Sequence, residues 1–324
     1  MGTMAVRSGI RLDDDLEQYR RELTGYCYRM LGSTFEADDA VQETMVRAWK
    51  GIDAFEGRSA VRSWLYRIAT NVCLDMLRGR QRRALAMDLG PSSPADTFTG
   101  VTRPEHAWLQ PVPDGRVIPT DGDPADVAEA KESIKLAFVT ALQALPPRQR
   151  AVLILREVLR WHATEVAELL DTTVASVNSA LQRARATLAA RNDGSTPDPE
   201  VVTAEQQALL DRYVDAFERY DITALVKLLH DDAIMSMPPY DFWLRGPVEM
   251  GRWFLGNGIG CQGSRLIPVA ANGHAGYGSY KPAADGGLHP WSIQVIEISG
   301  DRIVGHHNFL DTTLFAAFGL PDHL

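Results

Sequence analysis

The sequence predicts a multidomain chain in which two all-α domains are followed by an α+β domain. Its 324 residues exceed the length of one ordinary domain. Apolar side chains recur with helical spacing through residues 13–85 and again through residues 127–191. Residues 200–324 begin with helical spacing and then change to extended segments separated by glycine-containing turns, which is the order of an α+β fold.

The first domain, residues 13–85, is predicted to contain a helix ending at Gly32, one from Ala37 to Ile52, and one from about Ser59 to Arg80. Trp49 is expected in the core. The last helix and its tail are basic and carry interleaved aromatic residues, and cations neutralise phosphates while rings stack on unpaired bases. The alternative is a solvated arginine face. We expect this surface to bind single-stranded nucleic acid through Arg58, Arg62, Trp64, Arg67, Arg78, Arg80, Arg82 and Arg83.

The second helical domain, residues 127–191, contains a helix-turn-helix pattern between Thr164 and Arg185. Two short helices flank a turn at Asp171 to Val174, where short side-chain oxygens end one helix and cap the next. Their apolar stripes are too small to be buried alone, so we expect them to pack on Ala151 to Val158. Such a pattern places its second helix in the DNA major groove, and the alternative is an ordinary helical hairpin in an all-α core.

The net charge of −9 is unevenly distributed, which bears on nucleic-acid binding. Residues 1–85 carry 14 Lys or Arg against 12 Asp or Glu, and residues 127–192 carry 9 against 6. Residues 86–126 carry 2 against 7, and residues 193–324 carry 8 against 17. A DNA contact is therefore expected from the two mildly basic segments.

Residues 86–126 are predicted to be an acidic, proline-rich linker. A segment rich in Pro, Gly, Ser, Thr and Asp cannot bury enough apolar surface to fold alone. Trp108 and Leu109 are the exception, and we consider them candidate anchors.

The last domain, residues 200–324, is predicted to have helices at about Thr203 to Arg219 and Ile222 to Leu229, followed by a curled antiparallel sheet. Two turn sequences, at residues 285–287 and 299–301, indicate hairpins. Helices followed by such a sheet make an α+β cone around an apolar pocket. The strands are expected at residues 233–237, 264–272, 274–281, 288–299 and 302–310.

Three stretches resemble parts of a known family. Asp38 to Trp49 resembles the clamp-binding helix in region two of bacterial sigma factors of the sigma-70 superfamily. Ser63 to Arg78 resembles the following helix, which opens and recognises the −10 element. Leu145 to Val152, with the helix-turn-helix after it, resembles region four, which recognises the −35 element. Regions one and three have no counterpart, so the chain resembles the small extracytoplasmic-function (ECF) subgroup.

This resemblance implies two partners. One is promoter DNA at −35 and −10, and the other is the bacterial RNA polymerase core, contacted through its clamp and flap. Asn71 matches a position that contacts promoter DNA near the −10 element, and its amide can both donate to and accept from a base edge. The Trp108-Leu109 motif resembles one found in sigma factors with a C-terminal extension, so the acidic linker is expected either along the RNA exit path or as a plain tether. The clamp is expected to contact Asp38, Asp39, Gln42, Glu43 and Arg47.

The second helix of the helix-turn-helix departs from the family pattern. Relatives often carry basic residues at the positions of Asn178 and Ala180, whereas here the cations stand further along the helix. We expect Ser176, Asn178, Ser179 and Gln182 to approach base edges, and Arg183 and Arg185 to bind phosphates.

Asp221 to Ala233 and Leu244 to Phe254 resemble the SnoaL-like domain, which is related to ketosteroid isomerases, and the fusion resembles the SigG and SigJ type. Isomerase relatives place a carboxylate base just after the first strand, where residues 234–239 hold no acid. Tyr213 stands where relatives place an oxyanion-stabilising phenol. No catalytic residue, cofactor or metal is predicted, and a small ligand in the cone or a pure protein contact are the alternatives. Candidate pocket residues are Tyr213, Met237, Trp243, His274, Trp291 and His306, with adjacent His306 and His307 on opposite strand faces.

We interpret the chain as a promoter-specificity subunit of RNA polymerase and not an enzyme, with an acidic C-terminal domain that docks on the basic modules and regulates in cis. One alternative is a helix-turn-helix regulator that works without polymerase, and another is a SnoaL-type enzyme or ligand sensor fused to a DNA-binding module. Three widely spaced cysteines form neither a zinc nor a disulfide pattern. No apolar run suits a membrane span or signal peptide, so the cytoplasm is predicted.

Overall fold

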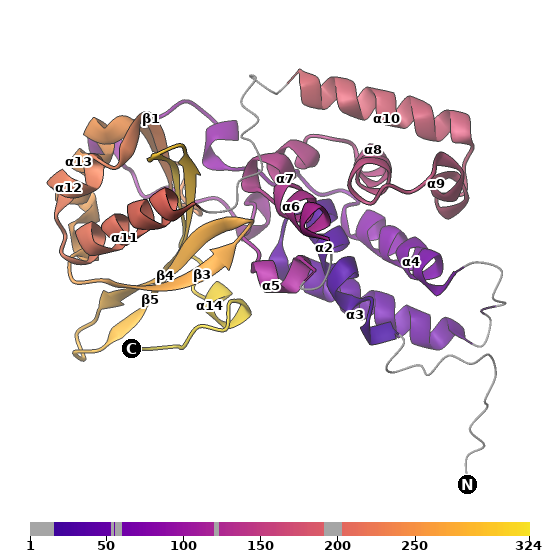
Figure 1. Ribbon diagram of the computed structural model, residues 1–324, viewed down its shortest axis with the longest axis horizontal. Coiled ribbons are helices and arrows are strands. Elements are labelled where there is room, and N and C mark those ends of the chain that lie inside the picture. The colour runs from indigo at the N-terminus through magenta and orange to yellow at the C-terminus, as the bar shows by residue number, and fades with distance from the viewer. Residues whose placement is uncertain (1–15, 53–54, 56–59, 120–122, 191–202) are drawn as a thin grey trace, which may run out of the picture. The chain divides into compact units, whose positions relative to one another are not determined.

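The computed structural model describes residues 16–52, 55, 60–119, 123–190 and 203–324, and its contacts divide them into two compact units (Figure 1). The helical unit contains the described residues of 1–80 and 115–194. The sheet unit contains those of 81–114 and 195–324. No described helix combines the length and the apolar composition needed to cross a membrane.

The first part of the helical unit is a bundle formed by α2 (Arg20–Leu31), α3 (Thr34–Gly51) and α4 (Val61–Met76). Helix α2 ends at Gly32, whose φ of 70° is left-handed. The Ser33 hydroxyl then accepts a hydrogen bond from the Glu36 amide and caps α3. The three predicted helices are confirmed, but the third ends at Met76 and does not continue to Arg80.

The expectation that Trp49 lies in the core is wrong, because its side chain is 64% exposed. Its neighbour Ala48 is fully buried, and one helical residue corresponds to a rotation of about 100°. Trp49 therefore lies with exposed Gln42 and Val46 on the opposite stripe of α3.

The second part of the helical unit contains the helix-turn-helix. Thr173 caps its second helix by accepting a hydrogen bond from the Ser176 amide at 3.1 Å. That helix packs on the two before it through buried Val177, Leu181 and Ala184. The predicted stripe of Val177, Leu181 and Leu188 is confirmed at its first two residues, and Leu188 is only partly buried. The elements are α5 (Asp114–Val117), α6 (Pro124–Glu132), α7 (Leu136–Gln143), α8 (Pro147–Leu153), a π-helical turn (Ile154–Val158), α9 (Ala163–Leu169) and α10 (Val174–Ala189).

The sheet unit is built on a six-stranded sheet in the order β2-β1-β6-β5-β4-β3. The strands are β1 (Leu229–Ser236), β2 (Trp243–Arg245), β3 (Arg265–Ala271), β4 (His274–Pro282), β5 (Leu288–Ser299) and β6 (Arg302–Phe309). The expected antiparallel sheet is wrong at one pair, because β1 and β6 run parallel. Parallel neighbours need a long connection, which here is the whole chain from β2 to β5.

The helices of the sheet unit cover one face of the sheet. Helices α11 (Ala204–Glu218), α12 (Ile222–Val226) and α13 (Gly246–Leu255) lie on that face in Figure 1 and supply its apolar core. A short helix, α14 (Leu314–Ala317), packs on the sheet through Phe315, whose ring meets that of Tyr280 edge to face at 5.1 Å. A 3-10 turn (Asn257–Cys261) follows α13.

The first part of the predicted linker is packed on the sheet unit. It forms 3-10 turns at Ala86–Asp88, Ala95–Thr97 and Glu105–Ala107. Trp108 and Leu109 are 3% and 0% exposed, which confirms them as anchors. This segment has too few apolar side chains to fold by itself, as its composition predicts. It buries those few side chains against the core of the sheet unit.

Candidate nucleic-acid and polymerase interfaces

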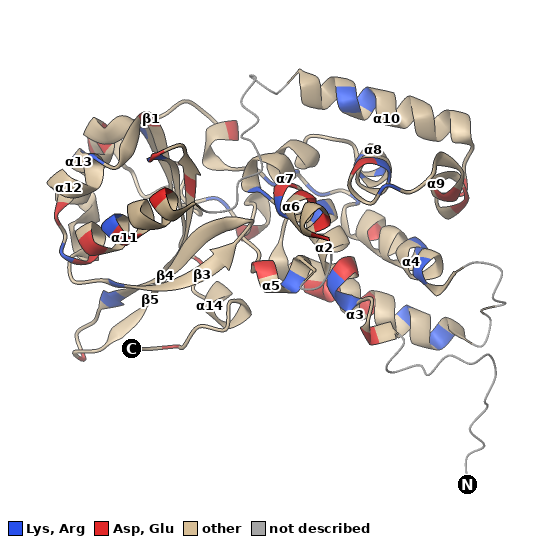
Figure 2. Cartoon of the chain, viewed as in Figure 1, with Lys and Arg blue, Asp and Glu red and all other residues tan. Residues whose placement is uncertain are grey.

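Helix α10 presents an open polar face. Its buried residues Val177, Leu181 and Ala184 follow helical spacing, so the positions between them point outward. The outward side chains are those predicted to contact DNA, and Ser176, Asn178, Ser179, Gln182, Arg183 and Arg185 are all exposed. No acidic residue occurs in α10 (Figure 2). The side chains predicted to contact DNA are therefore exposed to solvent along this face.

One cation of α10 already has a partner. Arg185 donates to the Glu157 carboxylate at 2.6 Å, and both side chains are largely exposed. Exposed ion pairs of this kind contribute at most about 1 kcal/mol. A phosphate can therefore replace Glu157 at little cost.

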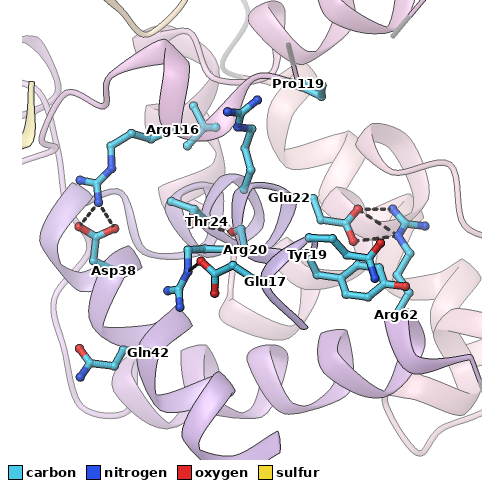
Figure 3. Close-up of a pocket in the computed structure, with 13 residues that line it drawn as sticks. Glu17, Tyr19, Arg20, Glu22, Thr24, Asp38, Gln42, Arg62, Arg116 and Pro119 are labelled. Carbon is cyan, nitrogen blue, oxygen red and sulfur yellow. Dashed lines mark hydrogen bonds and ion pairs between the residues drawn. The ribbon is translucent and has the colours of Figure 1, made fainter. Parts of the chain in front are cut away.

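Helix α4 differs, because contacts within the helical unit occupy its basic face. Arg62 forms an ion pair with Glu22 of α2, with Nε 3.0 Å from Oε2 (Figure 3), and its guanidinium lies over the Trp161 ring at 5.5 Å. Arg67 donates to the Glu168 carbonyl of α9 at 3.0 Å. Two of the predicted DNA contacts are thus used inside the protein.

An aromatic contact fixes the same face. The Tyr66 ring lies 5.1 Å from the Trp161 ring, and both side chains are buried. Trp64 packs on Phe55 at 4.9 Å, whereas Asn71 is exposed. The sequence offered no signal for the α4–α9 contact, since Trp161 lies 95 residues from Tyr66 along the chain.

The arginines after α4 have different environments. Arg78 and Arg80 pair with Asp75 and Glu36 respectively, and Arg82 is exposed. Arg83 is only 7% exposed and donates to the Trp108 carbonyl at 2.7 Å, so in this structure it holds the linker instead of facing solvent. Arg58 lies outside the described residues.

The predicted clamp-binding residues share the outer side of α3. Asp39, Gln42, Glu43 and Arg47 are exposed, and Arg47 pairs with Glu43 at 2.7 Å. Asp38 is half-buried and pairs with Arg116 of α5 at 2.9 Å. Burial raises the pKa of the Asp38 carboxyl, against the opposing charge of Arg116.

Asp38 and Gln42 line a groove of about 1050 Å³ that also includes Arg116 and Arg62 (Figure 3). Helix α5 lies close to α2 here, since a Cβ on Gly25 would be only 3.2 Å from the Val117 carbonyl oxygen. Helix α5, which lies within the predicted linker, therefore contacts one end of the predicted polymerase-binding face at Asp38.

In the sheet unit, half of the candidate pocket residues come together. The Tyr213 hydroxyl donates to Gln294 Oε1 at 2.7 Å and lies 2.9 Å from His306 Nε2. Met237 belongs to the same core. Burial, with a smaller effect of neighbouring His307, lowers the pKa of His306 to about 3, so this imidazole is neutral at pH 7.

The other half lies elsewhere. Trp243 packs on Trp108 and Ala86, away from the helix-covered core. His274 lies 3.9 Å from Glu297, and Trp291 packs under the Lys281 ammonium at 3.6 Å. His307 contacts Ser236 Oγ at 2.9 Å while His306 contacts Tyr213, which confirms that the two histidines face opposite sides. The described residues contain no cluster of three or more His, Cys, Asp or Glu suited to a metal.

Comparison with known proteins identifies similar chains. Residues 16–83 match the model of sigma-70 region 2, and residues 135–188 match that of sigma-70 region 4. The chain is 46% identical over 315 residues to the ECF RNA polymerase sigma factor SigG of Mycobacterium tuberculosis, covering 95% of this chain and 83% of SigG. It is 28% identical over 284 residues to SigJ of the same organism, covering 84% and 82%.

The crystal structure of Mycobacterium tuberculosis SigJ superimposes with a TM-score of 0.60 and 22% sequence identity, covering 95% of this chain and 99% of SigJ. At this identity the likeness shows a shared fold.

Proposed function

Because the chain belongs to the ECF RNA polymerase sigma factors, we propose that α10 binds the −35 element, that α4 and its tail bind the melted −10 strand, and that α3 docks on the polymerase clamp. The open polar face of α10 supports the first assignment. The exposed Asn71 amide and the arginines of α4 support the second. The exposed stripe of Gln42, Val46 and Trp49 supports the third, with the cytoplasm as the place of action.

Promoter binding requires the helical unit to open, and one observation carries this step. Arg67 of α4 is bonded to α9 at 3.0 Å, so the two DNA-binding parts touch. The −35 and −10 elements are separated by roughly 25 base pairs, or roughly 85 Å at about 3.4 Å per step. A unit with α4 and α9 in contact cannot reach both, and Arg62 and Arg67 cannot hold their present partners and phosphates together.

The linker provides the regulation in cis. Ala84 and Trp108 form a β-bridge in which the Ala84 amide donates to the Ala107 carbonyl at 2.9 Å and the Leu109 amide donates to the Ala84 carbonyl at 3.1 Å. Arg83 reinforces this bridge, which closes the loop and is called the neck below, by donating a hydrogen bond to the Trp108 carbonyl. The chain between α4 and α5 is therefore shortened, because residues 85–107 form a closed loop on the sheet unit.

Releasing that loop supplies the missing length. Its 23 residues, extended at about 3.4 Å each, add roughly 80 Å of reach, which is comparable to the promoter span. The sheet unit thus acts as an inhibitor, because it binds the loop of residues 85–107 and keeps the chain between α4 and α5 short. Polymerase or another factor must release this loop.

Run-off transcription with purified core polymerase tests the proposal. Arg83→Ala removes the guanidinium that holds the neck and should raise transcript yield several-fold, as should a chain ending at Arg191. Arg82→Ala is the matched control, because Arg82 is an exposed neighbour proposed to bind the same melted −10 strand, so its loss should lower transcript yield and not raise it. If Arg83→Ala and the truncated chain both gave wild-type yield, the regulation proposed here would be wrong; if no version directed transcription, the DNA and polymerase assignments would be wrong as well.

A further inference from the structure

Phe98 is the single Phe, Tyr or Trp in the loop of residues 85–107. Its ring packs against Tyr240, Phe242 and Trp253, which together form an aromatic box. The Phe98 centroid lies 4.9 Å from that of Tyr240, 5.1 Å from Phe242 and 4.9 Å from Trp253. Interplanar angles of 79°, 73° and 78° make every contact edge to face. This geometry is the favoured one for aromatic pairs.

The walls of the box belong to the sheet unit's own core. Phe242 and Trp253 are 6% and 8% exposed, and they contact each other at 5.1 Å. Phe98 itself is only partly buried and packs on this core from the loop. Trp253 lies on α13, and Tyr240 and Phe242 lie in the connection between β1 and β2, so the walls come from parts of the chain outside the loop.

The loop holds Phe98 in place from both sides. The Ala95 amide donates to Glu249 Oε2 at 2.8 Å, three residues before the ring. Arg103 binds both carboxylate oxygens of Asp241, at 2.5 and 2.6 Å, five residues after it. The residues between these anchors are otherwise small and polar or exposed, so the ring is the main apolar contact of this stretch.

We propose that Tyr240, Phe242 and Trp253 form a binding site for a planar, uncharged aromatic ring of about phenyl size, and that Phe98 is its intramolecular occupant. A free aromatic ligand competes with Phe98, and its binding detaches the middle of the loop. A tethered competitor acts at an effective concentration in the millimolar range or above, so the wild-type chain binds such a ligand weakly. The aromatic binding site does not depend on the transcriptional role. Only the effect that detaching the loop would have on promoter output rests on the proposed function.

Fluorobenzene binding to the full-length chain, followed by ¹⁹F NMR, tests the site. Phe98→Ala removes the competitor and should bind fluorobenzene at least about tenfold more tightly than wild type. Any apolar cavity can bind a benzene-like molecule, so a second phenylalanine is needed as control. Phe315→Ala serves, because Phe315 is 3% exposed and also contacts one ring edge to face in the sheet unit. It should bind fluorobenzene clearly more weakly than Phe98→Ala, and adding Trp253→Ala to Phe98→Ala should abolish the gain.

Hydrogen exchange in the wild-type chain provides a measurement that needs no variant. Saturating fluorobenzene should accelerate exchange of the Ala95 and Arg103 amides, whose acceptors lie in the sheet unit, and cyclohexane should not. Equal binding by Phe98→Ala and Phe315→Ala, or unchanged exchange at saturation, would overturn the proposal. Neither readout contains polymerase, so their failure leaves the sigma-factor assignments untouched.

Discussion

The two helices assigned to DNA, α4 and α10, are in opposite states within one unit. Helix α10 exposes Asn178, Gln182 and Arg183 to solvent. Helix α4 has Arg62 and Arg67 bonded to α2 and α9 and Tyr66 buried against Trp161. Both helices carry residues proposed to bind DNA; those of α10 are exposed, whereas on α4 Asn71 is exposed but Arg62 and Arg67 are bonded to other parts of the helical unit.

The candidate DNA-binding residues could be located from the sequence, whereas only the tertiary contacts show which of them already have partners inside the protein. The α4 face contacts the same part of the chain that contains the −35 helix. Region four thereby covers region two in the closed unit. Changes that separate the two helices should therefore have unequal consequences, and the predictions run from the strongest contact to the weakest.

Trp161→Ala should have the largest effect. The side chain is 5% exposed and contacts both Tyr66 and Arg62, and truncating a buried Trp costs about 3–5 kcal/mol. Urea denaturation followed by circular dichroism should show that loss in the helical unit. Trp49→Ala is the matched control, since Trp49 is 64% exposed and should change stability by less than about 0.5 kcal/mol. Equal effects of the two substitutions would show that α4 and α9 do not pack as described.

Asn178→Ala and Asn71→Ala should separate the two DNA-binding roles. Loss of a base contact by Asn178 should weaken binding of −35 duplex by about 1–3 kcal/mol, measured by fluorescence anisotropy. Asn71→Ala should leave that affinity and polymerase binding unchanged but reduce open-complex yield in a permanganate footprint. An unchanged footprint would contradict the −10 role of Asn71, and reduced duplex affinity in Asn71→Ala would contradict the division of labour.

Arg183→Ala should change the salt dependence of duplex binding. Each phosphate contact contributes roughly one unit to the slope of log K against log salt concentration, so the slope should become shallower by about one. Lys135→Ala, on α7's N-terminal side, is a suitable control because Lys135 is paired with Glu132 and lies outside the helix-turn-helix. A slope unchanged by loss of Arg183 would place phosphate binding elsewhere on α10.

Glu22→Gln should have the smallest effect on stability. The Arg62–Glu22 pair is partly exposed, with side-chain exposures of 41% and 29%, and such pairs contribute at most about 1 kcal/mol. The substitution frees Arg62, so the chain should bind single-stranded −10 oligonucleotide more tightly. Glu43→Gln, which removes the nearer of the two carboxylates paired with Arg47 on α3, is the control. Stronger binding in both variants would indicate a general charge effect.

The sequence predicted local elements well. Hairpin turns and alternating patterns located β3 to β6 within a residue or two, and Thr173 capped α10 as expected. It failed where the outcome depends on residues far apart in the chain. The parallel β1–β6 pair, the burial of Arg83 and the Trp161 contact all join distant segments, and no periodicity encodes them.

Phe98 illustrates the same limit in the linker. Its surroundings have the composition of an unstructured tether, and a lone phenylalanine among Thr, Gly and Pro carries no helical or strand signal. Only the box of Tyr240, Phe242 and Trp253 gives it a structural role. Trp108 and Leu109 were predictable because two large apolar residues stand together in a polar segment.

The most direct test of the account measures the distance between α4 and α9 with and without polymerase. Spin labels on cysteines placed at Ala60 and Thr164, both exposed, report this distance by pulsed electron paramagnetic resonance. Cys261 is first replaced by Ser, because it is less buried than Cys27 and Cys73. The free chain should give one short distance, and the complex with core polymerase and promoter DNA should give a much longer one. An unchanged short distance in a complex that makes transcript would contradict the account.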